Sequence, residues 1–389
     1  VLIDTAIADG HGTRTAIIND CGSWTYAELG DLAARIAGLI ETEGLVPGSR
    51  VLLRGPNTAT LIACWLGAIR AGCVAVTTVP LLRGPDLAPI VTRASPLLAL
   101  IDARTVTAMG GVEWIEAAGC RTLTFDGDFG DGELERRLKQ QPPSPKAHDS
   151  HRDDPALLAF TSGTTGVPKA TVQFHRDLLI PADGFSASAL EPSPEDRFCS
   201  SAPIGFTFGL GALVLFPFRA RATSVTIERP TATALLETID RHGVTLLLTA
   251  PTAYRTMLSD VGSYDLTSLR LCVSAGEHLP PSTHEAWTAT TGTQLVNGIG
   301  ATEMMHIFIA STPGETPAGS CGHPVPGYEA CVLDGAGLPL DSGTGRLAVR
   351  GPTGCRYLGD VRQNDYVIDG WNVTGDTYRI DEAGNFWFV

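Results

Sequence analysis

The chain has 389 residues, of which 43% are hydrophobic and 18% are charged. This composition excludes a disordered or fibrous protein and allows more than one domain with a large buried core. The net charge of −14 argues against nucleic acid or an anionic membrane as the main partner. The nine cysteines form no CxxC pair and no Cys/His cluster, and the sequence opens without a secretory signal. We therefore expect reduced thiols and a cytoplasmic protein.

Helical and strand patterns alternate from residue 20 to about residue 300, which predicts two similar α/β lobes with mostly parallel sheets. Thr25 and Glu28 have the spacing of a capping box, which opens an amphipathic helix that runs to about Glu43. A strand at 51–53, a helix at 58–70 and a β-rich run at 73–78 follow. We assign residues 1–170 to the first lobe, 171–312 to the second and 313–389 to a small β-barrel-like subdomain.

A segment rich in glycine and hydroxyl groups, Thr-Ser-Gly-Thr-Thr-Gly-Val-Pro-Lys, closes the first lobe between two extended runs. Glycine lets the backbone approach an anion closely, while backbone N–H groups, hydroxyls and an ammonium group supply donors. Such clusters are usually flexible surface loops, but this ordered string is much less common. It is not a Walker loop, because only two residues separate Gly163 and Gly166. The residues predicted to bind a polyphosphate are Thr161, Ser162, Gly163, Thr164, Thr165, Gly166 and Lys169.

Residues 198–218 contain no charged side chain and are long enough to span a bilayer. Pro203, Pro217 and three glycines interrupt this stretch. We therefore predict a buried strand, a loop and a buried helix in place of a membrane span.

The second lobe continues with predicted helices at 230–242, 251–259 and 280–291 and predicted strands at 245–249, 269–274 and 294–296. Ligands of open α/β sheets bind at the carboxyl ends of strands, so the turns after Ser274 and Val296 are candidate site loops. The first turn, Ser-Ala-Gly-Glu, offers a flat backbone surface. The second, Asn-Gly-Ile-Gly-Ala-Thr-Glu, places a hydroxyl and a carboxylate beside a glycine-rich turn. Taken alone, either turn could be a purely structural joint.

Glycine and proline become dense from about residue 313, and the remaining β-like runs are short, as in a small antiparallel sheet or barrel. The segment Asn-Val-Thr-Gly-Asp-Thr at 372–377 contains Asp376. Its acceptor-only carboxylate suits two adjacent hydroxyl donors. If this segment stood alone, a plain β-turn would be the better explanation of its Gly-Asp pair.

These four segments, in this order, resemble landmarks of the acyl-adenylate-forming superfamily, which includes acyl-CoA synthetases, luciferases and peptide-synthetase adenylation domains. The resemblance extends from about residue 15 to the end. It implies that Lys169 and its loop hold the β- and γ-phosphates of ATP, that Thr302 meets phosphate and that Glu303 binds Mg²⁺. It also implies that Asp376 bonds the ribose hydroxyls. Further residues implied to contact the nucleotide are Ala275, Gly276, Glu277, Asn297, Gly298 and Ile299.

The segments 174–179, 298–308 and 370–378 resemble more narrowly the benzoate and 2-aminobenzoate (anthranilate) CoA ligase branch. The run Phe-Thr-Phe-Gly-Leu-Gly at 206–211 resembles the aryl-pocket segment of this branch, and its Thr and second Phe favour the aminobenzoate members. A flat aromatic acid needs apolar walls and a few placed polar groups. The predicted pocket residues are Phe206, Thr207, Phe208, Gly209, Ala275, Gly298, Ile299, Gly300, Met304, His306 and Ile307.

His306 could be either a structural residue of the core or a polar group of this pocket. A lone histidine between apolar residues is normally a core histidine. This one lies three residues after Glu303, so the two side chains would share a face if the segment were helical. We expect His306 to orient the carboxylate or the ortho substituent of the acid.

The resemblance implies two half-reactions. The aryl carboxylate attacks the α-phosphorus of Mg·ATP to give aryl-AMP and pyrophosphate, and the thiol of coenzyme A then displaces AMP. The sequence ends at Val389, where the superfamily continues into a hinge and a small C-terminal domain with a catalytic lysine. We expect a chain without that domain to bind ATP and aryl-adenylate but to turn over slowly.

Other functions remain compatible with the sequence. Within the superfamily, these are a benzoate-CoA ligase and a free-standing adenylation domain that loads an acyl-carrier protein. Outside it, they are a non-catalytic nucleotide-binding module and, disfavoured by the glycine spacing, a Walker-type NTPase.

Overall fold

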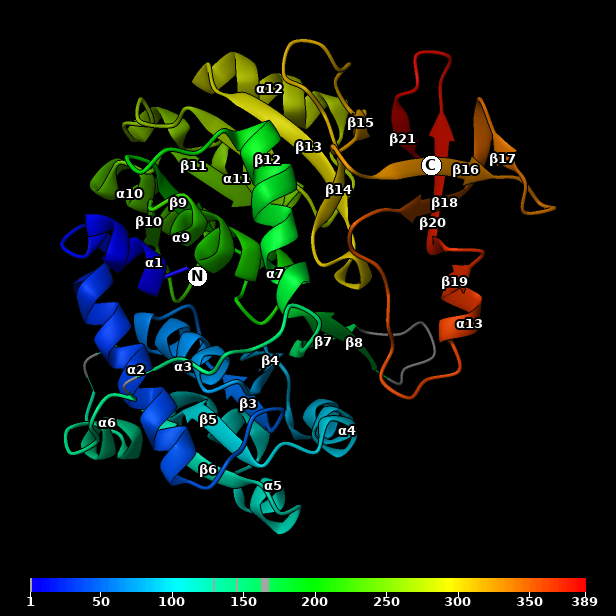
Figure 1. Cartoon of the computed structure of the whole chain (residues 1–389). Helices are drawn as coiled ribbons and strands as arrows, with labels where there is room; N and C mark the ends of the chain where they lie inside the picture. Colours follow the sequence, from blue (N-terminus) through cyan, green and yellow to red (C-terminus); the bar gives the residue numbers. More distant parts are fainter. Residues whose placement is uncertain (1, 129, 145, 162–167) are drawn as a thin grey trace.

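The computed structural model describes residues 2–128, 130–144, 146–161 and 168–389. It has two α/β lobes and a β subdomain that projects from their junction (Figure 1). Six residues of the predicted phosphate loop, Ser162 to Val167, lie outside the described residues. The predicted fold class, α/β with mostly parallel sheets, is confirmed.

The first lobe contains a six-stranded sheet with the order β6-β5-β3-β4-β7-β8, in which only β8 is antiparallel to its neighbour. Its strands are β3 (Arg50–Arg54), β4 (Val74–Thr78), β5 (Leu98–Asp102), β6 (Arg121–Phe125), β7 (Pro155–Thr161) and β8 (Lys169–Phe174). Its helices are α2 (Tyr26–Thr42), α3 (Ala59–Arg70), α4 (Gly84–Ala94), α5 (Glu113–Ala117) and α6 (Glu133–Leu138).

The second lobe contains a nine-stranded sheet with the order β15-β14-β13-β12-β11-β9-β10-β1-β2. Its strands are β1 (Thr15–Asn19), β2 (Gly22–Thr25), β9 (Arg197–Ser200), β10 (Thr223–Val225), β11 (Leu246–Thr249), β12 (Leu271–Ser274), β13 (Gln294–Gly300), β14 (Ile307–Ala310) and β15 (His323–Pro324). Its helices include α7 (His175–Pro181), α8 (Thr207–Leu210), α9 (Phe216–Arg219), α10 (Ala232–His242), α11 (Pro251–Met257) and α12 (Pro281–Thr291).

The two sheets exchange strands across the predicted lobe boundary at residues 170 and 171. β1 and β2 come early in the chain but pair with β10 in the second sheet, whereas β8 remains in the first sheet. The division into domains stays a prediction, and the sheets themselves divide the chain differently.

Both sheets are buried on two faces, as expected for parallel strands covered by crossover helices. Successive side chains of a strand point to opposite faces. Val51 and Leu53 therefore lie in a core shared by the two lobes, while Leu52 packs under α4. In the second lobe, Leu247 packs against α10 and Trp287 on the outer face. The shared core fixes the two lobes against each other, and the site is built at their junction.

The β subdomain is an antiparallel sheet with the order β17-β16-β18-β20-β19, and β21 also pairs with β20. Its elements are β16 (Glu329–Leu333), β17 (Pro339–Leu340), β18 (Gly343–Arg350), α13 (Gln363–Tyr366), β19 (Val367–Ile368), β20 (Trp371–Ile380) and β21 (Phe386–Phe388). The sequence also allowed a plain β-turn at the Gly-Asp pair. In the structure this pair forms no such turn, because Asp376 lies within the strand β20.

The uncharged stretch 198–218 forms β9, a loop, and the buried helical run from Thr207 to Arg219, as predicted. A π-helical turn at Gly211–Leu215 lies between α8 and α9. Among the described residues, no helix is long and apolar enough to cross a membrane.

The capping box of α2 forms as predicted: the Thr25 side chain accepts a hydrogen bond from the Glu28 N–H, and the Glu28 carboxylate accepts one from the Thr25 N–H. We expect Thr25→Ala to lower the free energy of unfolding by about 0.5–2 kcal/mol, because the Glu28 N–H in the first turn of the helix loses its acceptor. Urea denaturation measures this change, with Ser23→Ala on the exposed face of β2 as control. An equal loss in both variants would contradict the prediction.

Candidate functional site

The carboxylate predicted to bind metal lies on a short turn between β13 and β14. β13 continues through the predicted glycine turn to Gly300, and Thr302–Met304 then forms one 3-10 turn. Met305 adopts a positive φ of 70°, which ends the turn and sends the chain back as β14. The condition under which Glu303 and His306 would share a helix face is therefore not met, because no helix joins them.

Glu303 and Lys169 meet at this turn, although 134 positions of sequence numbering separate them. Glu303 is buried, with 7% of its surface exposed. The Lys169 Nζ lies 3.5 Å from its Oε1. The Tyr357 hydroxyl donates to the same oxygen at 2.6 Å and accepts from Lys169 at 2.7 Å. Burial and the hydrogen bond to Glu303 raise the pKa of Tyr357 well above its ordinary value, so the hydroxyl keeps its proton and acts as a donor.

Two further side chains hold the backbone of the turn. The buried Gln173 of β8 donates through Nε2 to the Thr302 carbonyl at 2.9 Å. The Thr353 hydroxyl donates to the Met304 carbonyl at 2.8 Å, and Tyr328 is hydrogen-bonded to Thr353 at 2.7 Å. The turn is therefore anchored by the first lobe on one side and by the segment before the β subdomain's α13 on the other.

Asp376, the predicted ribose ligand, faces the same region from β20. Its side chain is open to solvent, yet partial desolvation and the Glu303 charge both raise its pKa. One buried carboxylate with a second nearby fits Mg²⁺, which takes one or two carboxylates together with substrate phosphates. No three potential metal-binding side chains gather anywhere in the described part of the chain, so the phosphates would have to complete such a site.

The residues predicted to contact the nucleotide from the turns after β12 and within β13 are only partly exposed. Ala275 is buried at the end of β12, while Gly276 (φ 87°) and Glu277 are exposed, and Glu277 accepts a hydrogen bond from Thr252 at 2.6 Å. The nucleotide contact predicted for Asn297 stays a prediction, because its side chain bonds within the protein. It is buried and donates to the Ser320 carbonyl at 3.0 Å, so it stabilises the protein interior.

Contacts between the lobes hold the loop that leads into the predicted aryl-pocket segment at 206–211. Asn57 donates to the Ala202 carbonyl at 3.0 Å and accepts from the Ile204 N–H at 2.9 Å. At Gly209, a Cβ atom would lie 2.1 Å from the Pro203 carbonyl oxygen, so only glycine fits. Thr207 is buried, whereas Phe206 is 48% exposed.

His306 is enclosed by aromatic rings. Its ring centroid lies 5.5 Å from that of Phe208, 5.7 Å from Phe185 and 4.7 Å from Phe216. Burial lowers its pKa to about 3, and the nearby Phe208 backbone offsets this only in part, so the imidazole is neutral near pH 7. Neither ring nitrogen has a hydrogen-bond partner of normal geometry among the described residues.

The other predicted pocket residues surround this histidine in sequence and in the fold. Met304 and Ile307 are buried. A Cβ atom on Gly298 would lie 2.8 Å from the Ile307 side chain, so these two residues are in close contact. Ile299 and Gly300 pair with β14 at the end of β13 and are partly or fully exposed.

The depressed pKa of His306 makes stability depend on pH. An unfolded histidine has a pKa near 6.5, so between pH 6.5 and about 3 the unfolded chain binds a proton that the folded chain rejects. Stability is thus lost as pH falls through this window, by up to about 1.4 kcal/mol per pH unit from this group. We expect His306→Leu to flatten the slope by up to one proton. Denaturation at several pH values measures it, and an unchanged slope would contradict the assignment.

The two described cavities lie elsewhere. One of about 820 Å³ is lined by Trp65, Leu178 and Tyr328 between the lobes, and one of about 560 Å³ by Arg350 and Arg356 beside the β subdomain. Neither cavity is lined by a predicted site residue, so the candidate site rests on the contacts among Lys169, Glu303 and Tyr357.

Sequence reasoning missed several residues of the site. Tyr357 and Thr353 were not predicted, because neither stands in one of the four segments on which the prediction rested. Gln173, Phe185 and Phe216 carried no recognisable signal, because glutamine and phenylalanine are common on buried elements.

Comparison with known proteins places this geometry in a family. A family model described as AMP-binding enzyme matches residues 5–357. The chain belongs to this family. The benzoate–CoA ligase of Thauera aromatica is 32% identical, over 100% of this chain and 75% of its own length. The anthranilate–CoA ligase of Pseudomonas aeruginosa is 30% identical, over 98% of this chain and 72% of its own length.

Solved structures of the family give the same result. An anthranilate CoA ligase in complex with anthranoyl-AMP has a TM-score of 0.94 and 29% identity, over all of this chain and 76% of that one. A benzoate CoA ligase from Burkholderia xenovorans has a TM-score of 0.90 and 30% identity, over all of this chain and 78% of that one. The predicted superfamily, its benzoate/anthranilate branch and the ATP-dependent acid–thiol ligase type are thereby confirmed.

Proposed function

We propose that this chain activates an aromatic carboxylic acid with ATP and transfers the acyl group to coenzyme A, with 2-aminobenzoate as the leading substrate. The observation that carries the proposal is the pairing of two features on one turn. Glu303 stands beside Lys169 at the polar end, and the neutral, aromatic-walled His306 lies three residues further on.

The polar end supplies charge stabilisation. In the first half-reaction an oxygen of the acid forms a bond to the α-phosphorus, and the bond from that phosphorus to the pyrophosphate oxygen breaks. The Lys169 ammonium would bind the departing pyrophosphate, and Thr302 would donate to the α-phosphate. Preorganised charges of this kind lower the barrier because they need no reorganisation during reaction. Mg²⁺, held by Glu303, would neutralise phosphate charge.

The second half-reaction needs no nucleophile from the protein. The thiol sulfur attacks the acyl carbon, the bond from that carbon to the AMP oxygen breaks, and the thiol proton is released. Cys355 agrees with this, because burial and the Glu303 charge raise the pKa of its thiol to about 12. It is therefore a thiol at neutral pH, which is the poorly nucleophilic form.

The choice of 2-aminobenzoate rests on His306. A buried neutral imidazole that has no hydrogen bond of normal geometry among the described residues costs free energy until a ligand group pairs with it. An ortho amine or hydroxyl could make this hydrogen bond, whereas benzoate offers only its carboxylate. The fold similarity to the anthranoyl-AMP complex supports the same choice, and the sequence similarity to benzoate–CoA ligase supports the unsubstituted acid.

Calorimetric binding of benzoate, 2-aminobenzoate and 2-hydroxybenzoate in the presence of Mg·ATP would test the proposal. We expect 2-aminobenzoate to bind most tightly, and equal affinity for all three acids would reject the aminobenzoate assignment. Absence of any acid-dependent effect on ATP binding would favour a non-catalytic nucleotide-binding module. Free coenzyme A and a phosphopantetheinylated carrier protein, offered to preformed aryl-AMP, distinguish the two acceptors.

A further inference from the structure

A segment that precedes α13 is attached to the edge of the first lobe's sheet. The Val172 N–H donates to the Arg356 carbonyl at 2.8 Å, and the Leu358 N–H donates to the Ala170 carbonyl at 2.9 Å. Tyr357 thereby lies opposite Thr171 of β8 in a single antiparallel bridge. Residues 356–358 thus act as a short extra strand that covers the edge formed by β8.

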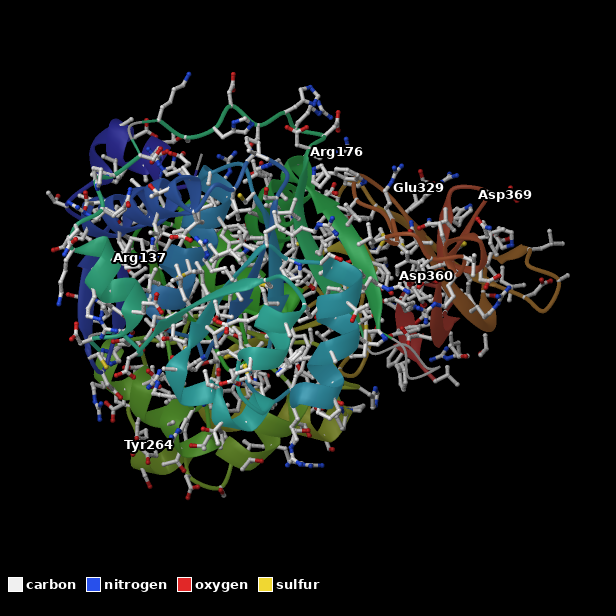
Figure 2. All side chains as sticks on the ribbon, turned by 90° about the horizontal axis from the view of Figure 1, so that it is seen from below. Arg137, Arg176, Tyr264, Glu329, Asp360 and Asp369 are labelled. Atoms are coloured by element: carbon white, nitrogen blue, oxygen red, sulfur yellow. The ribbon has the colours of Figure 1, made fainter. Side chains whose placement is uncertain are left out.

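Side chains from two other elements fix this segment. Gln363 of α13 accepts from the Tyr357 N–H at 2.7 Å and donates to the Cys355 carbonyl at 3.1 Å. Arg93 of α4 donates to the Leu358 carbonyl at 3.1 Å and pairs with Asp360 at 3.0 Å. Asp360 is seen in Figure 2 where the β subdomain approaches the first lobe. The backbone of Tyr357 is therefore held from both sides.

The tyrosine side chain then reaches the two charged groups of the site. Its hydroxyl donates to Glu303 at 2.6 Å and accepts from Lys169 at 2.7 Å, whereas the direct Lys169–Glu303 distance is 3.5 Å. Each hydrogen bond of the hydroxyl is thus shorter than the direct contact between the two charged groups. Tyr366 packs edge-on against the Tyr357 ring at 5.7 Å between centroids.

Glu303 needs such a partner because the other anchors hold only the backbone of its turn. Gln173 and Thr353 fix the carbonyls of Thr302 and Met304, but neither touches the Glu303 carboxylate. A glutamate side chain keeps rotational freedom even on a fixed backbone, and its loss on binding opposes affinity. A hydrogen bond from a rigid, buried tyrosine restricts that freedom before the ligand arrives.

We infer that Tyr357 is a positioning residue, which holds the Glu303 carboxylate in place for a metal–nucleotide complex. The inference rests on the proposed function, in which Glu303 faces the metal. Tyr357 acts through Glu303 and need not touch the substrate. It also makes the site depend on the docking of residues 356–358 against β8, since only that docking brings the hydroxyl to Glu303.

The test compares ATP binding with and without metal, by calorimetry on this chain. For Tyr357→Phe we expect the Kd of Mg·ATP to rise roughly tenfold or more, which is the size of a lost hydrogen bond to a charged group. The Kd of ATP in EDTA should stay within about twofold of the wild-type value, because Lys169, which is proposed to bind phosphate, keeps its direct ion pair with Glu303 in the variant. The matched control is Tyr366→Phe, which also removes a tyrosine hydroxyl nearby, but one with no hydrogen bond to Glu303; both constants should be unchanged.

Three results would overturn the inference. Tyr357→Phe could match wild type in both conditions, or it could weaken binding equally with and without metal, which indicates a general structural role. The third concerns Tyr357→Phe combined with Glu303→Gln. If Tyr357 acts through Glu303, this double variant binds Mg·ATP as poorly as Glu303→Gln alone, and fully additive losses contradict that. Failure of the wild-type chain to bind ATP in either condition would instead reject the proposed function, and the inference with it.

Discussion

Replacement of Glu303 by glutamine is expected to lower the rate of adenylate formation by roughly 10²–10³, the usual cost of removing one transition-state charge stabiliser. The amide keeps the size and one acceptor oxygen of the carboxylate, so the Tyr357 hydroxyl retains a partner. What is lost is the negative charge beside Lys169 that would bind the metal. Pyrophosphate exchange with 2-aminobenzoate as the acid measures the rate.

The control for this variant is Glu329→Gln. Glu329 lies on β16 and pairs with Arg350 at 2.6 Å on an exposed surface (Figure 2). Surface ion pairs of this kind contribute little, so the control should keep the wild-type rate. A Glu303→Gln variant as active as this control would show that Glu303 does not serve the reaction, and raising the Mg²⁺ concentration should restore part of the lost rate if it does.

Replacement of Gly211 by alanine is expected to weaken binding of the aromatic acid by about ten- to a hundredfold while the affinity for Mg·ATP is kept. A Cβ atom at this position would lie 2.5 Å from both Cδ2 and Nε2 of His306. The imidazole cannot retreat easily, because it is enclosed by Phe185, Phe208 and Phe216. Overpacking of a buried site typically costs 1–3 kcal/mol, and one kcal/mol changes an affinity about fivefold.

Calorimetric titration of 2-aminobenzoate measures this change. Gly184→Ala is the matched control, because it is also a helical glycine near α7 but a Cβ atom there would meet nothing closer than 3.9 Å. Equal affinities for the acid in the two variants would contradict a role of His306 in the pocket. Parallel loss of acid and nucleotide binding would instead indicate general unfolding, which a melting curve detects.

The correct sequence predictions were those that depend on neighbouring residues. The capping box at Thr25, the helices around Ala232–His242 and Pro281–Thr291, and the buried strands all follow from periodicity and caps that act within one or two turns. The helix face that Glu303 and His306 would share in a helical segment does not form, because the backbone departs from helical geometry at Met305. The positive φ there depends on the return of the chain as β14, which no local pattern reports.

The strand exchange between the sheets is a second example of this limit. Nothing within residues 169–174 indicates that β8 pairs with β7 and stays in the first sheet, or that β1 joins β10 about 200 positions later. Sheet order is set by which apolar faces are buried together. That burial is a property of the whole chain. The boundary predicted at residue 170 was based on sequence patterns, which do not show how the strands pair.

The sequence by itself determined which residues are candidates for the chemistry, because Lys169, Glu303 and His306 stand in ordered motifs whose residue types suit phosphate, metal and an aromatic acid. Only the tertiary structure decided how they work together. Tyr357 reaches Glu303 across 54 positions and Lys169 across 188, through an extra strand at the edge of β8. A motif states what a side chain can bind, whereas the distance between two motifs depends on sheet order and register, and these are fixed only when the whole core packs.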